Sequence, residues 1–406
     1  MLYLNPIFES ASNHRYDTGD YRKVDPILGT NTDFRKLCAA AGDCGIRIVL
    51  DGVFAHTGAD SRYFNRFRHY PGCGAYNSTN SVYARWYDFA HYPNDYRCWW
   101  NFRDLPAINT ANPDWRKYMI TGEHSVVRAW LQDGASGWRL DVADELPDDV
   151  LRDLRTAAKQ TDPDSVLLGE VWEDAVTKVS YGARRQYALG DALDSVMNYP
   201  LRDALIAFLT GRSTARALAD LLLSQRLNYP QPLYYALMNL TASHDVARTR
   251  SALALDFDPR SRTRAQLAAL DVTDAMAARG AQLQLLAAAV QFWLPGIPSI
   301  YYGDEAGMQG LCDPFNRAPL QMCDTQMLQW YAKLSALRHA HPALQRGEIV
   351  QLHLQEIIPS RSICLVYDHH RPLNTAARKF QQMLTKADPP RPAASKQTES
   401  ISFVSQ

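Results

Sequence analysis

The feature that most constrains the fold is an alternation of short apolar runs with amphipathic helical segments. Seven runs have the character of buried strands: Met1–Phe8, Ile46–Val53, Ser136–Val142, Val166–Trp172, Asp194–Asn198, Leu233–Leu240 and Pro298–Gly303. Helical patterns follow them, at Asn31–Ala41, Asn112–Leu131, Pro147–Lys159, Leu201–Leu209, Ala215–Gln225, Thr263–Leu294 and Gln326–His339. Strands that alternate with helices form parallel sheets. We therefore predict an α/β fold of the (β/α)8-barrel type, with one strand fewer than a closed barrel.

The alternation is interrupted once and weakens near the end. Residues 57–111 show no periodicity and are rich in Gly, Asn, Tyr, Trp and Pro. This stretch is too long for an ordinary βα loop, so we predict an inserted, loop-rich subdomain there, with residues 1–56 and 112–345 forming the barrel. Residues 346–387 are predicted to form a remnant C-terminal β domain. Residues 388–406, rich in Pro, Ser, Lys and Gln, are predicted to be a disordered tail.

Charge and cysteine content exclude several classes of protein. Lys+Arg and Asp+Glu both number 43, so no net field favours nucleic acid or an anionic membrane. The seven cysteines form no CxxC pair, which indicates reduced thiols rather than disulfides or a zinc site. The chain opens without a signal peptide, and its longest apolar helical run is too short for a membrane span. We expect a soluble, cytoplasmic chain without membrane or nucleic-acid partners.

Acidic residues recur at or shortly after the ends of the predicted strands. These residues are Asp51, Asp141, Glu170 and Asp245. In a βα barrel, the carboxyl ends of the strands meet at one mouth. Asp141 and Glu170 are 29 residues apart, one βα unit, so they lie on adjacent strands about 4.8 Å apart. Two carboxyl groups at that spacing match the pair of a retaining glycosidase.

Local environment assigns a role to three of these acids. Arg139 precedes Asp141 by two residues on one strand, so both side chains share a face, and the guanidinium should keep the carboxylate charged, as a nucleophile requires. Glu170 has apolar neighbours that favour its protonated form, which makes it the better proton donor. Asp245 could bind the sugar more strongly as it approaches an oxocarbenium ion.

These side chains also have plainer structural interpretations. An isolated pair such as Arg139 and Asp141 is more often structural than catalytic, and His56 alone would more often be a core or capping histidine. The recurrence of acids at strand ends favours the catalytic interpretation. We assign Trp99 and Trp100 to the core of the insertion rather than to a platform for substrate.

Seven motifs occur in an order that is specific, although each one alone is weak. They are Leu4–Phe8 with Ser12–Thr18, Asp51–His56, Leu105–Asn109, Gly137–Asp141, Gly169–Trp172, Ser243–Asp245 and Gly296–Glu305. With these motifs, the chain resembles the α-amylase family (glycoside hydrolase family 13) from residue 1 to about residue 345. Within it, the chain is most similar to the neopullulanase, cyclomaltodextrinase and maltogenic amylase group.

The resemblance implies a role for each matching residue. Asp141 would be the nucleophile, Glu170 the acid/base and Asp245 the stabiliser of the transition state. The residues expected to bind substrate or order the site are Arg139, His56, His244, Tyr16, His14 and Asp51. Among these, Tyr16 would stack on the sugar and Asp51 would order a strand end.

The chain departs from the family at its start and at one metal ligand. Met1 falls within the match to the second strand, so the first strand and helix and the group's usual N-terminal β domain are expected to be truncated, and the insertion follows the third strand. That domain helps to form the group's homodimer, so dimerisation is left open. Ala55 stands where many relatives carry a calcium-binding Asn. A methyl group cannot coordinate calcium, so we expect this calcium site to be absent. Calcium elsewhere stays possible, and we expect no cofactor to be required.

We therefore interpret the chain as a retaining α-glucan hydrolase that acts through a covalent glucosyl-enzyme. Its expected substrates are maltodextrins, cyclodextrins or pullulan. Two alternatives stay open: an α-glucosyl transferase or isomerase of the same family, and an inactive fragment that binds sugar. The sequence does not distinguish a preference for α-1,4 from one for α-1,6 bonds.

Overall fold

The computed structural model describes residues 1–345. The chain divides into two compact units, Met1–Asn198 and Tyr199–Gln406. The predicted β domain and tail at 346–406 lie outside the described residues. The predicted division into barrel and insertion stays a prediction.

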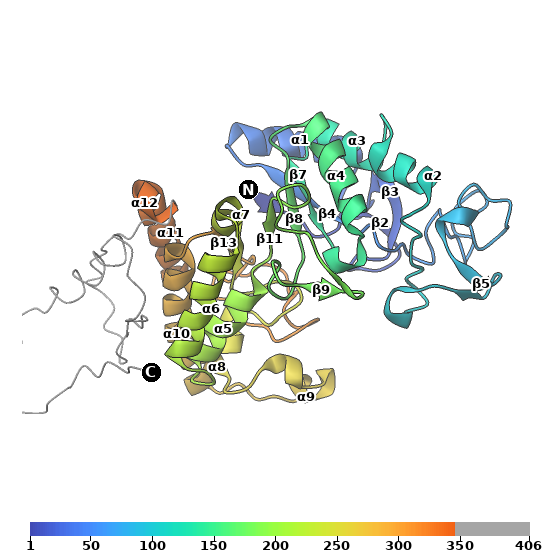
Figure 1. Cartoon of the computed structure of the whole chain (residues 1–406). Helices are drawn as coiled ribbons and strands as arrows, with labels where there is room; N and C mark the ends of the chain where they lie inside the picture. Colours follow the sequence, from blue (N-terminus) through green and yellow to red (C-terminus); the bar gives the residue numbers. More distant parts are fainter. Residues whose placement is uncertain (346–406) are drawn as a thin grey trace, which may run out of the picture. The chain divides into compact units, whose positions relative to one another are not determined.

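Five parallel strands form the sheet of the first unit. Their order is β1 (Leu2–Tyr3), β4 (Ile48–Gly52), β7 (Gly137–Leu140), β8 (Val166–Gly169) and β11 (Ser195–Val196). Every neighbouring pair is parallel, which confirms the prediction from the alternation. Helices α1 (Asn31–Asp43), α3 (Val126–Gln132) and α4 (Asp148–Thr161) lie in the connections between these strands (Figure 1). Thr30 caps α1 by accepting a hydrogen bond from the N–H of Asp33.

Two predicted elements of this unit are divided in the structure. The first predicted strand separates into β1 and β2 (Phe8–Ser10), and β2 pairs antiparallel with β3 (Thr18–Val24). The predicted helix at 112–131 breaks at Gly122 into α2 (Pro113–Arg116) with a π-helical turn η3 (Lys117–Thr121), and then α3. Ser125 starts α3 by accepting a hydrogen bond from the N–H of Arg128, and this local cap overrides the continuous apolar period.

Aromatic rings fill the core between the sheet and its helices. Phe8 contacts Tyr21, Trp130 and Trp138 at centroid distances of 5.1 to 6.2 Å. All four side chains are buried. The indole N–H of Trp130 donates to the carbonyl of Tyr21 at 2.7 Å, so the ring that fills the core also satisfies its polar atom.

Residues 57–111 contain only short elements, and aromatic packing takes the place of regular structure. These elements are η1 (Ala84–Trp86), β5 (Phe89–His91), β6 (Asp95–Tyr96) and η2 (Trp99–Asn101). The buried ring of Phe64 contacts four others, those of Tyr76, Tyr87, Phe89 and Tyr96. The prediction for Trp100 was wrong, because 69% of this residue is exposed.

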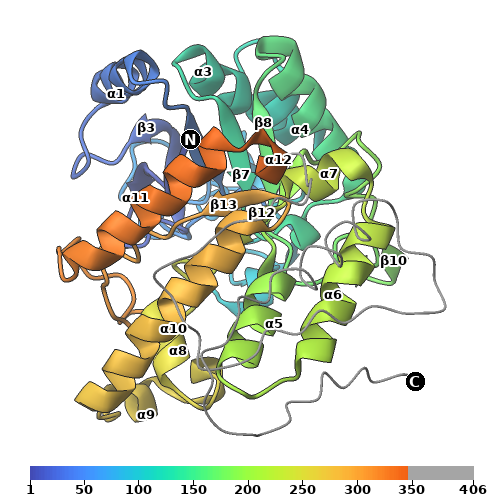
Figure 2. The ribbon, with the colours of Figure 1, turned by 90° about the vertical axis from the view of Figure 1, so that its left-hand side faces the viewer.

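The second unit carries two further parallel strands, β12 (Met238–Leu240) and β13 (Ile297–Ser299). Its helices are α5 (Tyr199–Leu209), α6 (Ala215–Asn228), α7 (Gln231–Ala236), α8 (Thr249–Ala254), α9 (Arg264–Ala268), α10 (Asp274–Trp293), α11 (Thr325–Ala340) and α12 (Pro342–Gln345), with the 3-10 turn η5 (Pro259–Ser261). Helices α10 and α11 run side by side (Figure 2). Side chains of α10 and α11 form one apolar cluster of this unit, and side chains of α5, α8 and α10 contribute to another.

Two predictions for this unit need correction. The run Leu233–Leu240 was predicted as one strand, but it begins inside α7 and only its end is β12. Pro232 stands in the first turn of α7, a position that proline favours. The long helical region at 263–294 is α9 and α10, because Thr273 caps a new helix by accepting from the N–H of Met276.

Over the described part of the chain, no helix combines the length and apolarity needed to cross a membrane.

Close packing of β7 on β8 generates a prediction for stability. A Cβ atom on Gly137 would lie 2.3 Å from the carbonyl oxygen of Val166, and neither backbone can shift without breaking the pairing. We expect Gly137→Ala to lower the free energy of unfolding by at least about 1–3 kcal/mol, the usual penalty for overpacking. Urea denaturation of the full chain measures this loss.

Gly42 provides the matched control. It lies in the last turn of α1, and an added Cβ would meet nothing within 4 Å. Gly42→Ala should therefore leave stability unchanged or raise it by up to about 1 kcal/mol. Equal stability of both variants would contradict the close approach of the two strands.

Candidate active site

The candidate site is built around Arg139 on β7. Its side chain is fully buried. Its Nη1 lies 2.9 Å from Oδ1 of Asp51 and 2.8 Å from Oδ1 of Asp141, and its Nη2 lies 2.8 Å from Oε2 of Glu170. The sequence predicted the pairing with Asp141, which the structure confirms. It gave no sign that the same guanidinium also contacts Asp51 and Glu170.

Strand register explains how one side chain contacts three acids. Asp51 pairs with Arg139 across β4 and β7, and Leu140 pairs with Gly169 across β7 and β8. Asp141 and Glu170 are the next residues along their strands, so they emerge side by side at the same edge of the sheet. The predicted meeting of these three acids at adjacent strand ends is confirmed within the first unit.

Two neighbours that the sequence did not reveal hold the carboxylate of Glu170. The backbone N–H of Val142 donates to Oε2 at 2.8 Å, and the indole N–H of Trp172 donates to Oε1 at 3.1 Å. Val142 adopts φ 41°, a left-handed conformation that is rare for a β-branched residue. Such strain is tolerated where surrounding contacts fix it, often at functional sites. Nothing in the identity of Val142 signals this role.

Burial and the Arg139 charge act in opposite directions on the pKa of Asp141 and of Asp51. Burial raises the pKa of Asp141 well above its usual value, Arg139 opposes this, and the nearby carboxylates of Glu170 and Asp51 add to it. Burial likewise raises the pKa of Asp51, against the effect of Arg139. Arg139 thus favours the carboxylate form of Asp141, the direction that the sequence predicted, although burial raises the pKa by more. Because Asp51 and Asp141 share this guanidinium, a proton bound by one of them affects the pKa of the other.

Two tyrosines complete the contacts of Asp51. The hydroxyl of Tyr3 donates to Oδ2 at 2.6 Å, and that of Tyr16 donates to the same oxygen at 2.9 Å. Together with Arg139, these donors occupy a carboxylate that is itself buried. Asp51 is therefore suited to ordering the site rather than to reacting. The sequence pointed to Tyr16 but not to Tyr3, which lies on β1 beside β4.

The predicted histidines of the first unit gather around Tyr16. His14 packs its ring on Tyr16 at a centroid distance of 6.1 Å, and its Nδ1 accepts from the backbone N–H of Tyr16. His56 is 2% exposed, and its Nε2 lies 3.1 Å from the carbonyl oxygen of Tyr16. Burial lowers the pKa of His56 to about 4. His56 is thus a neutral ring near neutral pH, and it is linked to the acidic cluster through Tyr16, which donates to Asp51.

The remaining predicted residues belong to the second unit. Asp245 follows β12, and its Oδ2 lies 3.1 Å from Nε2 of the buried His244 and 3.4 Å from the hydroxyl of Tyr199. Arg317 approaches Oδ1 of Asp245 at 3.9 Å. Asp245 and His244 therefore adjoin each other, and their approach to Asp141 and Glu170 stays a prediction.

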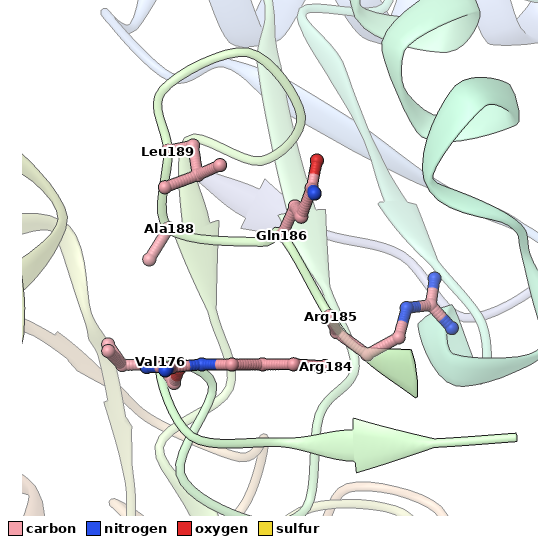
Figure 3. A pocket seen from close by; sticks show the side chains of 6 residues that line it. All are labelled: Val176, Arg184, Arg185, Gln186, Ala188 and Leu189. Carbon is pink, nitrogen blue, oxygen red and sulfur yellow. The ribbon is translucent and has the colours of Figure 1, made fainter. Parts of the chain in front are cut away.

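Two other features carry no site of their own. Within residues 1–345, no group of three or more His, Cys, Asp or Glu side chains could hold a metal ion. A hollow of about 400 Å³ lies beside the hairpin of β9 (Val179–Ser180) and β10 (Ala183–Arg184) (Figure 3). Its two guanidinium groups are already engaged, that of Arg184 with the carbonyl of Val176 and that of Arg185 with Asp148.

Comparison with known proteins identifies the family. The catalytic-domain model of α-amylase matches residues 1–322. An amylopullulanase of Thermoanaerobacterium thermosulfurigenes is 37% identical over 87% of this chain and 20% of its own length. For neopullulanase 2 of Thermoactinomyces vulgaris, the identity is 32% over 87% of this chain and 55% of the relative. The chain thus spans between a fifth and about half the length of these curated relatives.

Solved structures agree with this match. The cyclic α-maltosyl-(1→6)-maltose hydrolase of Arthrobacter globiformis, 31% identical, superposes with a TM-score of 0.70 over 85% of this chain and 70% of that one. A Thermus thermophilus protein, 32% identical, gives the same score over 84% of this chain and 69% of its own. The parallel strands described above therefore belong to a TIM-barrel fold. This chain is a member of the α-amylase family of glycoside hydrolases.

Proposed function

We propose that this chain hydrolyses α-glucosidic bonds in maltodextrins, cyclodextrins or pullulan, with retention of configuration. The observation that carries the proposal is the contact of the Arg139 guanidinium with both Asp141 and Glu170 at the ends of paired strands. Paired strands lie about 4.8 Å apart. Retaining glycosidases keep their two carboxyl groups about 5–5.5 Å apart, whereas inverting enzymes need about 6.5–9.5 Å. The names of the amylopullulanase and neopullulanase relatives support the class of substrate.

The reaction would proceed in two displacements. In the first, Glu170 gives its proton to the glycosidic oxygen while a carboxylate oxygen of Asp141 attacks the anomeric carbon, so the glucan leaves and an ester forms on Asp141. In the second, Glu170 takes a proton from water, whose oxygen attacks the same carbon and releases Asp141. Arg139 contacts both reacting acids and would keep them in place through both steps.

The other predicted residues would bind and orient the sugar. Asp245, with His244, would stabilise the transition state through hydroxyl groups that bind more tightly as positive charge develops. His56 would offer a neutral ring nitrogen, which suits a hydrogen bond to a sugar hydroxyl. Tyr16 and His14 would provide the stacking face, with Asp51 keeping Tyr16 in place.

We propose that this reaction needs no metal or organic cofactor, because side chains supply both the acid and the nucleophile. Ala55 presents a methyl group that cannot ligate calcium. A cytoplasmic location belongs to the same proposal. Six cysteines of the described part of the chain are free thiols: Cys38, Cys44, Cys73, Cys98, Cys312 and Cys323. Reduced thiols are typical of the cytosol.

Replacement of the nucleophile tests the proposal. Asp141→Asn keeps the size of the side chain but removes the charge that attacks the anomeric carbon. We expect kcat on a p-nitrophenyl maltoside to fall by at least about 10³-fold, while maltopentaose binding measured by calorimetry changes little. As a matched control, Asp149→Asn alters an exposed acid on α4 that pairs with Arg116 and should leave kcat within about twofold. Appreciable turnover by a folded Asp141→Asn protein would refute the role.

The lowered pKa of His56 predicts a dependence of stability on pH. The folded chain binds a proton at His56 only near pH 4, whereas the unfolded chain binds it near pH 6.5. The stability contributed by neutral His56 is therefore complete above pH 6.5 and is lost as pH falls toward 4. Since one pKa unit corresponds to about 1.4 kcal/mol, this loss amounts to roughly 3 kcal/mol.

Urea denaturation at several pH values measures the loss. His56→Gln should lose less stability than the wild type between pH 6.5 and 4, by up to about 3 kcal/mol. His91→Gln, at a histidine exposed to solvent, should follow the wild type. Parallel profiles for all three proteins would show that His56 titrates normally and is not buried beside the cluster.

A further inference from the structure

Three aromatic rings form a parallel stack on the loop around η2. The ring of Trp99 stacks with that of Trp100, at a centroid distance of 4.9 Å and 9° between planes, and with that of Phe102, at 5.9 Å and 24°. Trp99 is half-buried, but Trp100 is 69% exposed and Phe102 is 56% exposed. The wide, flat ring of Trp100 therefore lies toward solvent, so packing in a core does not explain why this position holds a tryptophan.

Contacts from two other loops hold this ring in place. The indole N–H of Trp100 donates to Oε1 of Glu145 at 3.3 Å, and the hydroxyl of Tyr181 donates to Oε2 at 2.6 Å. Tyr181 is itself 77% exposed. Glu145 is in η4 (Ala143–Glu145), and Tyr181 is in the turn between β9 and β10. One carboxylate thus bridges two exposed aromatic side chains from separate loops.

The backbone at three positions of these loops adopts a left-handed conformation. Trp100 has φ 45°, Asn101 has φ 63° and Tyr181 has φ 52°. A left-handed conformation is unfavourable for residues with bulky side chains. Its occurrence at both exposed aromatic residues indicates that their orientation matters more than the local backbone energy.

The aromatic stack adjoins the candidate active site by two routes within the first unit. Trp99 packs against His56 at a centroid distance of 5.3 Å, and His56 contacts Tyr16, which donates to Asp51. Glu145 follows Asp141 by four residues on the loop after β7. A sugar chain leaving the acidic cluster would therefore meet these side chains.

We propose that Trp100 and Tyr181, joined by Glu145, form a binding platform for a glucosyl unit some distance from the bond that is cleaved. The inference rests on the proposed function and adds a determinant of chain length. Flat aromatic faces pack on the apolar face of a pyranose ring, and the remaining lone pairs of Glu145 can accept bonds from its hydroxyl groups. The ligand is an α-glucan longer than a disaccharide, because a short ligand held at the acids would not extend to the platform.

The experiment compares substrates of different length in the full chain. We measure kcat/KM for p-nitrophenyl α-maltoside and p-nitrophenyl α-maltopentaoside with the wild type and with Trp100→Ala. The ratio of the long to the short substrate should fall by about tenfold, the effect expected for losing one ring contact. Phe67→Ala, at a half-exposed ring of the same insertion, should leave the ratio unchanged. An unchanged ratio in Trp100→Ala would overturn the platform.

A binding measurement separates this inference from the proposed function. Calorimetry with maltopentaose and maltose, on the Asp141→Asn background, should show about tenfold weaker maltopentaose binding after Trp100→Ala and little change for maltose. This result would support the platform even for a chain without turnover. Normal turnover with unchanged maltopentaose affinity would overturn the platform and leave the proposed function intact.

Two further measurements keep the test decisive. Tyr181→Ala should lower the same ratio, and it replaces Trp100→Ala if that variant does not fold, as judged by near-ultraviolet circular dichroism. Sedimentation at micromolar concentration examines the competing use of these rings as an interface between copies of this chain. A dimer that Trp100→Ala dissociates, with an unchanged ratio of substrates, would overturn the sugar platform.

Discussion

The buried guanidinium of Arg139 is the interaction on which the arrangement of the site depends. Burying a carboxylate without a partner costs several kcal/mol. Three buried acids, Asp51, Asp141 and Glu170, lie at the ends of β4, β7 and β8 at one edge of the sheet. Arg139 lies on the middle strand of these three, so its two terminal nitrogens contact all three acids. The strand order thus determines which acids share a cation, and this sharing keeps Asp141 and Glu170 together at one edge of the sheet.

The sequence predicted the parallel sheet because strand and helix periods alternate along the chain and each period reflects burial. The predicted bounds of an element were wrong where a local signal, such as a proline or a helix cap, competed with the apolar period. The run from Leu233 is rich in tyrosine and leucine, as strands often are, but Pro230 and Pro232 favour the start of a helix, α7. Caps at Ser125 and Thr273 divided helices that the apolar pattern joined. The hairpin of β2 and β3 was missed because β2 has only three residues and its pairing with β3 is irregular.

The acids of the site could be predicted because carboxyl ends of parallel strands converge. Apart from the pairing of Arg139 with Asp141, most of their contacts could not be predicted. The contact of Tyr3 with Asp51 depends on register between β1 and β4, and the contact of Val142 with Glu170 depends on a backbone conformation that its side chain disfavours. The exposure of Trp100 could not be predicted either, because an aromatic residue in an irregular stretch can lie in a core or at the surface. The sequence gives the number of aromatic residues in the loop but not which of them face solvent.

The stereochemistry of the first product tests the central claim most directly. Proton NMR can follow the anomeric signals of maltopentaose during the first minutes of hydrolysis, before mutarotation mixes them. If Arg139 holds Asp141 and Glu170 at the separation of a retaining pair, the new reducing end forms as the α anomer and the β signal grows only later. Release of the β anomer first would mean that water attacks the sugar directly, and it would contradict the account.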